Sequence, residues 1–198
     1  MLDRDLAASR RAARLCGATV IWNLVVGSAA VATAAITGSL ALIGFGVNAV
    51  VDSSVSSLLV WRFGAQAPER ADRIEHVALR VAGWAFTVIA VYLLVQGTRS
   101  LLANARADTS LFGIVEAVAA LAVLPYLGVA KYRLSQRLRS RALRADSLLT
   151  ASGIALAAVA LAGLLLQRAT GWRSTDPIAA LIIAAVLAWQ GFRALRER

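Results

Sequence analysis

Six stretches of largely apolar sequence constrain this chain more than any other feature. Each approaches or exceeds the ~20 helical residues that cross the ~30 Å hydrocarbon core of a bilayer. They occupy residues 15–36, 39–61, 77–97, 111–130, 145–166 and 176–191. The composition agrees, because 59% of the residues are hydrophobic, whereas soluble domains average about 45–50%. We therefore expect an all-α membrane protein whose residues 1–198 form a single transmembrane domain of six helices.

The basic residues indicate how these spans are oriented. The chain has 21 Lys and Arg residues and a net charge of +10, and these residues gather between the apolar runs. Seventeen of them, including Lys131, lie at the two termini, in the second and fourth links or, for Arg80, at the start of the third span. Short basic segments usually stay in the cytoplasm, so we expect both termini to be cytoplasmic. This distribution favours an integral membrane protein over a nucleic-acid-binding protein. We expect the protein in the bacterial inner (plasma) membrane, surrounded by lipid.

The sixth span begins with a recognisable helix start. Asp176 is followed by Pro177, and acidic N-caps followed by proline at the first helical position are common in helices. The sequence therefore predicts that Asp176 caps its own helix.

Two polar side chains interrupt the second span. Asn48 and Asp52 are four residues apart, so they project from the same face of a helix, where an unpaired carboxylate is costly. Carboxylate and amide oxygens suit divalent cations, and a carboxylate can exchange a metal ion for a proton. We predict that Asn48 and Asp52 bind a transported cation. The alternative is a structural hydrogen bond to Ser53, Ser56 or a neighbouring helix.

A second polar pair opens the fifth span. Asp146 and Thr150 are also four residues apart, which places them on one helical face. Asp146 either has a structural role, capping the helix or pairing with Arg141 or Arg144, or lines a cytoplasmic entrance. We include Asp146 and Thr150 as further candidate cation ligands.

The remaining polar residues of the spans suit mainly structural roles. Glu116, near the outer end of the fourth span, is protonated, exposed to water or paired with Arg106. Asn23 is expected to form a hydrogen bond across helices, His76 to lie solvated at the membrane interface, and Cys16 to pack in the core.

Catalytic signatures are missing from the sequence. It contains no P-loop, no glycine-rich dinucleotide turn and no nucleophile–base pair, and its single cysteine excludes a cysteine-based metal cage. We expect neither an enzyme nor a bound cofactor.

The second span, SLALIGFGVNAVVD, resembles the second transmembrane helix of the cation diffusion facilitators, which exchange protons for zinc and related divalent metals. Asn48 and Asp52 take that family's two ligand places, and further positions of its pattern are matched by Ser39, Ala41 and Leu42. The segments ERADRIEHVALRVAGWAFTVIAVYLLV, SRALRADSLLTAS and GWRSTDPIAALIIAAVLAWQGFR are similar to a short branch of the family. That branch is related to transmembrane protein 163 and lacks the cytoplasmic metal-binding domain.

The resemblance implies proton-coupled efflux of a divalent cation such as zinc by alternating access, in a homodimer with no further soluble domain. Where the family places two fifth-helix ligands, this sequence has Leu149 and Gly153, and neither side chain binds metal. A second interpretation therefore stays open, namely a transport-incompetent relative that acts as a membrane assembly or regulatory partner. A third is transport of another small cation or organic solute.

Overall fold

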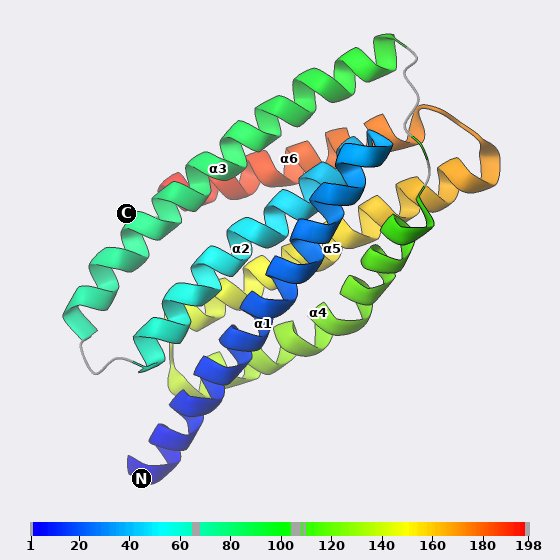
Figure 1. Cartoon of the computed structure of the whole chain (residues 1–198). Coiled ribbons are helices and arrows are strands. Elements are labelled where there is room, and N and C mark those ends of the chain that lie inside the picture. The colour runs from blue at the N-terminus through cyan, green and yellow to red at the C-terminus, as the bar shows by residue number, and fades with distance from the viewer. Residues whose placement is uncertain (1, 65–67, 104–107, 109, 197–198) are drawn as a thin grey trace.

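The computed structural model describes residues 2–64, 68–103, 108 and 110–196, and their side chains except at 2–7, 62–64, 68–79 and 141. Within these ranges the chain forms six helices and no strand (Figure 1). The helices are α1 (Leu2–Thr37), α2 (Leu40–Gly64), α3 (Pro68–Leu102), α4 (Leu111–Leu138), α5 (Arg141–Thr170) and α6 (Thr175–Arg196). The predicted all-α, six-helix architecture is confirmed.

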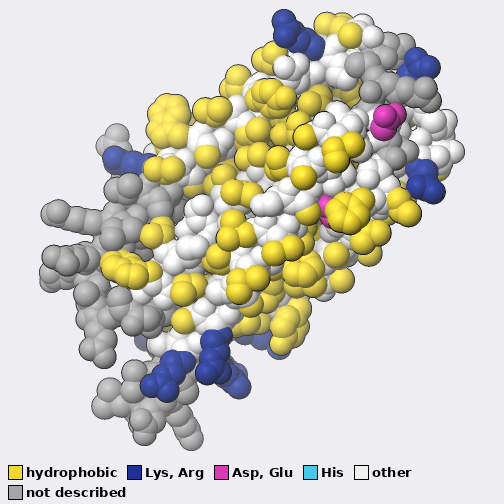
Figure 2. All heavy atoms as spheres, viewed as in Figure 1, with side chains coloured by type: hydrophobic (Ala, Val, Ile, Leu, Met, Phe, Trp, Pro, Cys, Tyr) yellow, Lys and Arg dark blue, Asp and Glu magenta, His cyan; other side chains and the backbone are white. Residues whose placement is uncertain are grey.

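All six helices contain a segment long and apolar enough to cross a membrane. They run alternately up and down, so that the start of α1 and the end of α6 lie at the same end of the bundle (Figure 1). Figure 2 shows hydrophobic side chains over the middle of one face and Lys and Arg side chains toward its two ends. This is the surface of an integral membrane protein. That both termini face the cytoplasm stays a prediction.

Glycine and serine mark several of the helix ends. Gly38, between α1 and α2, has φ +73°, and Gly171, after α5, has φ +67°. Glycine enters this left-handed region without a steric penalty, and it therefore terminates helices well. Ser110 and Ser140 precede α4 and α5, and each side chain accepts a hydrogen bond from a backbone N–H in the first turn of its helix. They are the N-caps of these two helices.

The role of Asp176 differs from the prediction. Because α6 begins at Thr175, Asp176 lies inside the first turn instead of preceding it. Its carboxylate accepts hydrogen bonds from the hydroxyl of Ser39 and the backbone N–H of Leu40, at the start of α2. The first N–H groups of a helix lack partners within that helix, and the helix dipole favours negative charge there. Asp176 therefore caps α2.

Helix α2 is surrounded by other helices of the bundle. It packs against α1, α3, α5 and α6, and two glycines let its backbone approach that of α1. A Cβ atom added to Gly27 of α1 would lie 2.9 Å from the carbonyl oxygen of Gly46 of α2. Small residues commonly permit such approaches between membrane helices, where lipid supplies no hydrophobic driving force. The polar face of α2 is consequently enclosed by protein.

Candidate cation site

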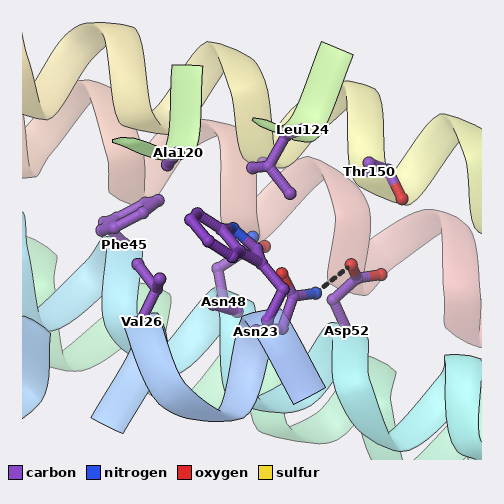
Figure 3. Close-up of a pocket in the computed structure, with 11 residues that line it drawn as sticks. Asn23, Val26, Phe45, Asn48, Asp52, Ala120, Leu124 and Thr150 are labelled. Carbon is purple, nitrogen blue, oxygen red and sulfur yellow. Dashed lines mark hydrogen bonds between the residues drawn. The ribbon is translucent and has the colours of Figure 1, made fainter. Parts of the chain in front are cut away.

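Asp52 lies on α2 inside the bundle, and only 3% of it is exposed. The side-chain amide of Asn23, on α1, donates a hydrogen bond of 2.7 Å to Oδ2 of Asp52 (Figure 3). This bond confirms the expectation that Asn23 bonds across helices. The other carboxylate oxygen, Oδ1, is buried and has no hydrogen-bond partner. Since buried polar atoms nearly always have partners, Oδ1 is the oxygen available to a cation, a proton or a water molecule.

Asp52 and Asn48 border a small cavity between α1, α2, α4 and α5. Its volume is about 10 Å³, close to the minimum that holds one water molecule. Figure 3 shows Asn23 and Asp52 on α1 and α2, with Leu124 and Thr150 on the opposite side of the cavity. The other residues of the wall are Trp22, Val26, Phe45, Ala49, Ala120 and Gly153. The cavity is therefore mainly apolar, with its oxygen donors supplied by α1, α2 and α5.

The two ligand places that the family pattern assigns to the fifth helix differ in position. Gly153 lines the cavity, and a Cβ atom added to it would lie 3.6 Å from Nδ2 of Asn48. Leu149 packs against the hydrophobic core and does not line the cavity. Thr150, in contrast, lines the cavity, while its hydroxyl donates a hydrogen bond of 3.1 Å to the backbone carbonyl of Asp146 one turn earlier.

A second polar cluster adjoins the cavity and is centred on Asp146. The hydroxyl of Ser56 donates a hydrogen bond of 2.6 Å to Oδ1 of Asp146. Nζ of Lys131, on α4, lies 2.6 Å from Oδ2 of Asp146 and 3.3 Å from the hydroxyl oxygens of both Ser56 and Thr150. None of the four side chains is more than 1% exposed. We call these four residues the Lys131 cluster, and Thr150 belongs to both the cluster and the cavity.

This cluster corrects the predictions made for Asp146. Ser140 is the N-cap of α5, so Asp146 does not cap the helix. Its ionic partner is Lys131, whereas Arg144 is exposed and the side chain of Arg141 lies outside the described residues. Asp146 faces the interior because it lies one turn from Thr150 on the buried face of α5, while Arg144 lies on another face.

Lys131 is the functional candidate that sequence reasoning missed. We assigned it to a cytoplasmic link because the apolar run of the fourth span ends at residue 130, but α4 continues to Leu138. The missed signal is helical periodicity. Lys131 continues a series of buried positions that recur every three or four residues, namely Ala120, Leu124, Leu127, Lys131, Leu134 and Ser135.

Glu116 lies apart from the candidate site. It is 6% exposed and accepts a hydrogen bond of 3.2 Å from the hydroxyl of Thr33, so it is not exposed to water. Arg106, its suggested partner, lies outside the described residues, and so does the side chain of His76. Cys16 is buried as expected, with its Sγ atom 3.9 Å from Oδ2 of Asp146.

The charged groups at the site are few. Among the described residues, no group of three or more His, Cys, Asp and Glu side chains is placed to hold a metal ion. The cavity itself has Asp52 as its one acidic side chain, with the charges of Asp146 and Lys131 near enough to act on it. The site is thus a sparse oxygen site with one carboxylate and several neutral donors.

Comparison of the sequence with known proteins identifies a family. The sequence profile of the cation efflux transmembrane domain matches residues 18–198. The chain belongs to the cation efflux family. This agrees with the resemblance to cation diffusion facilitators and with the prediction of a transporter family, and not an enzyme.

A curated relative gives the same picture. The protein described as "Uncharacterized transporter sll1263", from Synechocystis sp. (strain ATCC 27184 / PCC 6803 / Kazusa), is 28% identical over 170 residues. The match covers 82% of this chain but only 55% of that relative. This cation efflux family member therefore spans about half the length of the curated protein it matches.

Proposed function

We propose that this protein is a divalent-cation transporter, with a zinc-like cargo, that exports its cation in exchange for protons by alternating access. The single observation that carries the proposal is the carboxylate of Asp52, which is buried between helices and has one oxygen without a protein partner. An intramembrane carboxylate at an internal cavity is typical of an ion pathway.

The binding step follows from the oxygens around the cavity. Asp52 would bind the cation or a proton, and Asn48 would add an amide oxygen. Because hard and borderline divalent cations accept such oxygen ligands, the neutral donors are compatible with a transient cargo site. A site with one carboxylate binds weakly, which suits a cation that must also be released.

Asp146 and Thr150 would lie near the inner mouth of the proposed path, toward the end of the bundle that holds the start of α1. Both are buried on the inner face of α5, and Thr150 reaches the cavity of Asp52. Deprotonated Asp52 accepts the cation from the inner side, and protonation from the outer side favours its release. The cavity of about 10 Å³ corresponds to a closed state, so movement of α1 and α2 against α4 and α5 would open each side in turn.

The functional unit that we propose is a homodimer in the inner membrane of a bacterium, in contact with lipid. The family resemblance supports the dimer, and the excess of Lys and Arg on the side of the two termini supports the orientation with both termini in the cytoplasm.

The test is zinc flux into proteoliposomes that contain a trapped metal-sensitive dye, with and without a pH gradient. Wild-type protein is compared with Asp52→Asn, which keeps the shape of the side chain and removes its charge. Glu116→Gln is the matched control, because Glu116 is a buried carboxylate that does not line the cavity. We expect gradient-dependent flux in wild type and in the control, and a loss of at least about tenfold in the Asp52 variant, equivalent to ~1.4 kcal/mol or more.

A second candidate function is that of a transport-incompetent membrane partner. It is favoured by the absence of metal-binding side chains at Leu149 and Gly153 and by the pairing of Asp146 with Lys131. The burial of Asp146 and Thr150 beside Asp52 argues for the transporter, because a partner protein has no need of converging polar groups. Flux equal to that of empty liposomes, from folded protein and with several divalent cations, would select the partner function.

A further inference from the structure

Lys131 is placed as a cation in a binding site would be. Its Nζ atom has three oxygens within 3.3 Å, namely Oδ2 of Asp146 and the hydroxyl oxygens of Ser56 and Thr150. These three oxygens come from two other helices, α2 and α5, and converge on the ammonium group. One carboxylate and two hydroxyls form an oxygen set that a small cation also accepts. The position filled by the ammonium is thus a cation site in its chemistry.

The charges of Lys131 and Asp146 depend on each other because both side chains are buried. Both Lys131 and Asp146 are 0% exposed, and each charge would be very costly in this position without the other. A buried pair of this kind is weak evidence for stability, because apolar residues of similar volume often serve as well. We therefore look for the reason for this ion pair in the function of the candidate site and not in the stability of the fold.

The cluster is directly connected to the candidate site. Thr150 lines the cavity of Asp52 and also lies 3.3 Å from Nζ of Lys131. Ser56 follows Asp52 by one helical turn on α2. The described side chains of the two sets carry two negative charges and one positive charge, a net charge of −1. With Lys131 in place, Asp146 is already neutralised and unavailable to a second cation.

We propose that Lys131 is a tethered cation that occupies a latent inner cation site formed by Asp146, Ser56 and Thr150. By filling this site it restricts the transported cation to Asp52 and Asn48. A divalent ion bound there is left with uncompensated positive charge, which weakens binding and speeds release. Lys131 is in this way a specificity-determining residue, and the proposal rests on the proposed transport function for its biological meaning but not for its test.

The experiment is equilibrium binding of Zn²⁺ and Cd²⁺ to the purified, tag-free full chain in detergent. Wild type is compared with Lys131→Met, which keeps the length and removes the charge, and with Lys131→Arg, which keeps the charge. We expect K131M to bind Zn²⁺ at least about tenfold more tightly than wild type, since Asp146 becomes free to bind it. K131R is expected to remain within about threefold of wild type.

The double variant K131M/D146N identifies the group responsible. It removes both charges, so it leaves no unpaired buried ion, and it is expected to lose the gain in affinity. Thermal unfolding supplies a second measurement. K131M should melt at a lower temperature than wild type in EDTA, because Asp146 has lost its partner, and added Zn²⁺ should restore the melting temperature.

The outcomes separate this proposal from the proposed function. Folded K131M with unchanged or weaker Zn²⁺ affinity would overturn it, and so would a gain that persists in K131M/D146N. If K131M folds only in the presence of the divalent cation, the proposal is supported. If it fails to fold in either condition, Lys131→Gln takes its place, with the same expected gain. Loss of flux in Asp52→Asn tests transport alone, so a protein that transports nothing can still gain a cation site through K131M.

Discussion

The amide of Asn23 donates to Oδ2 of Asp52 across the α1–α2 interface at 2.7 Å, while Oδ1 of the same carboxylate has no partner. Asn23 therefore orients Asp52 by holding one carboxylate oxygen, and the other oxygen is left for a cation, a proton or a water molecule. Replacing Asn23 by Leu should lower stability by about 1–3 kcal/mol, because a buried carboxylate oxygen loses its donor. Thermal unfolding in detergent, followed by tryptophan fluorescence, measures the change.

A double-mutant cycle isolates this bond. Asn23→Leu combined with Asp52→Leu removes both partners, and replacing both by apolar groups is expected to recover much of the loss. Strictly additive losses in the double variant would show that the two side chains are not coupled.

Asp176 is expected to stabilise α2, a different helix from its own. Its carboxylate accepts from the hydroxyl of Ser39 and the backbone N–H of Leu40, so Asp176→Ala should cost about 1–3 kcal/mol. Hydrogen exchange should accelerate first at the start of α2. Asp108→Ala is the control, because the side chain of Asp108 is exposed. Faster exchange confined to α6 would contradict the assigned role.

Gly27 is expected to tolerate no side chain. A Cβ atom there would lie 2.9 Å from the carbonyl oxygen of Gly46 and 3.0 Å from Cβ of Ala49, so α1 and α2 would have to separate. Gly27→Ala should therefore destabilise the bundle by about 1–3 kcal/mol through overpacking. Gly17→Ala on the same helix is the matched control, since its nearest neighbour would lie 3.9 Å away. Equal melting temperatures for the two variants would refute the close contact.

Gly153 offers a way to strengthen the cation site. A Cβ atom at this position meets only Nδ2 of Asn48 at 3.6 Å and Cδ1 of Leu124 at 3.7 Å, which are ordinary contacts. Gly153→Asp should place a second carboxylate at the cavity and raise Zn²⁺ affinity at least about tenfold, or ~1.4 kcal/mol. Gly153→Asn, with the same shape and no charge, should show a much smaller gain. Calorimetric titration distinguishes them, and equal affinities would mean that the added charge does not reach the cation.

The architecture was predictable because it depends on properties that sequence carries directly. A bilayer requires about 20 apolar residues per crossing and internal satisfaction of every backbone hydrogen bond, so six apolar runs already imply six helices. The need of Asp52 for a partner on another helix was predictable for a related reason, since a carboxylate in the middle of an apolar helix is costly when unpaired. Its spacing from Asn48 also follows from helical geometry.

Tertiary structure alone decided which groups pair with the buried carboxylates of Asp146 and Asp176. Local spacing offered Arg141 and Arg144 to Asp146, but the packing of α4 against α5 supplied Lys131, 15 residues earlier in the chain. In the same way, Asp176 resembled a cap for its own helix, and only the position of α2 beside α6 made it a cap for α2. Sequence periodicity determines which face of a helix is buried, but the orientation and register between helices determine which buried charges meet.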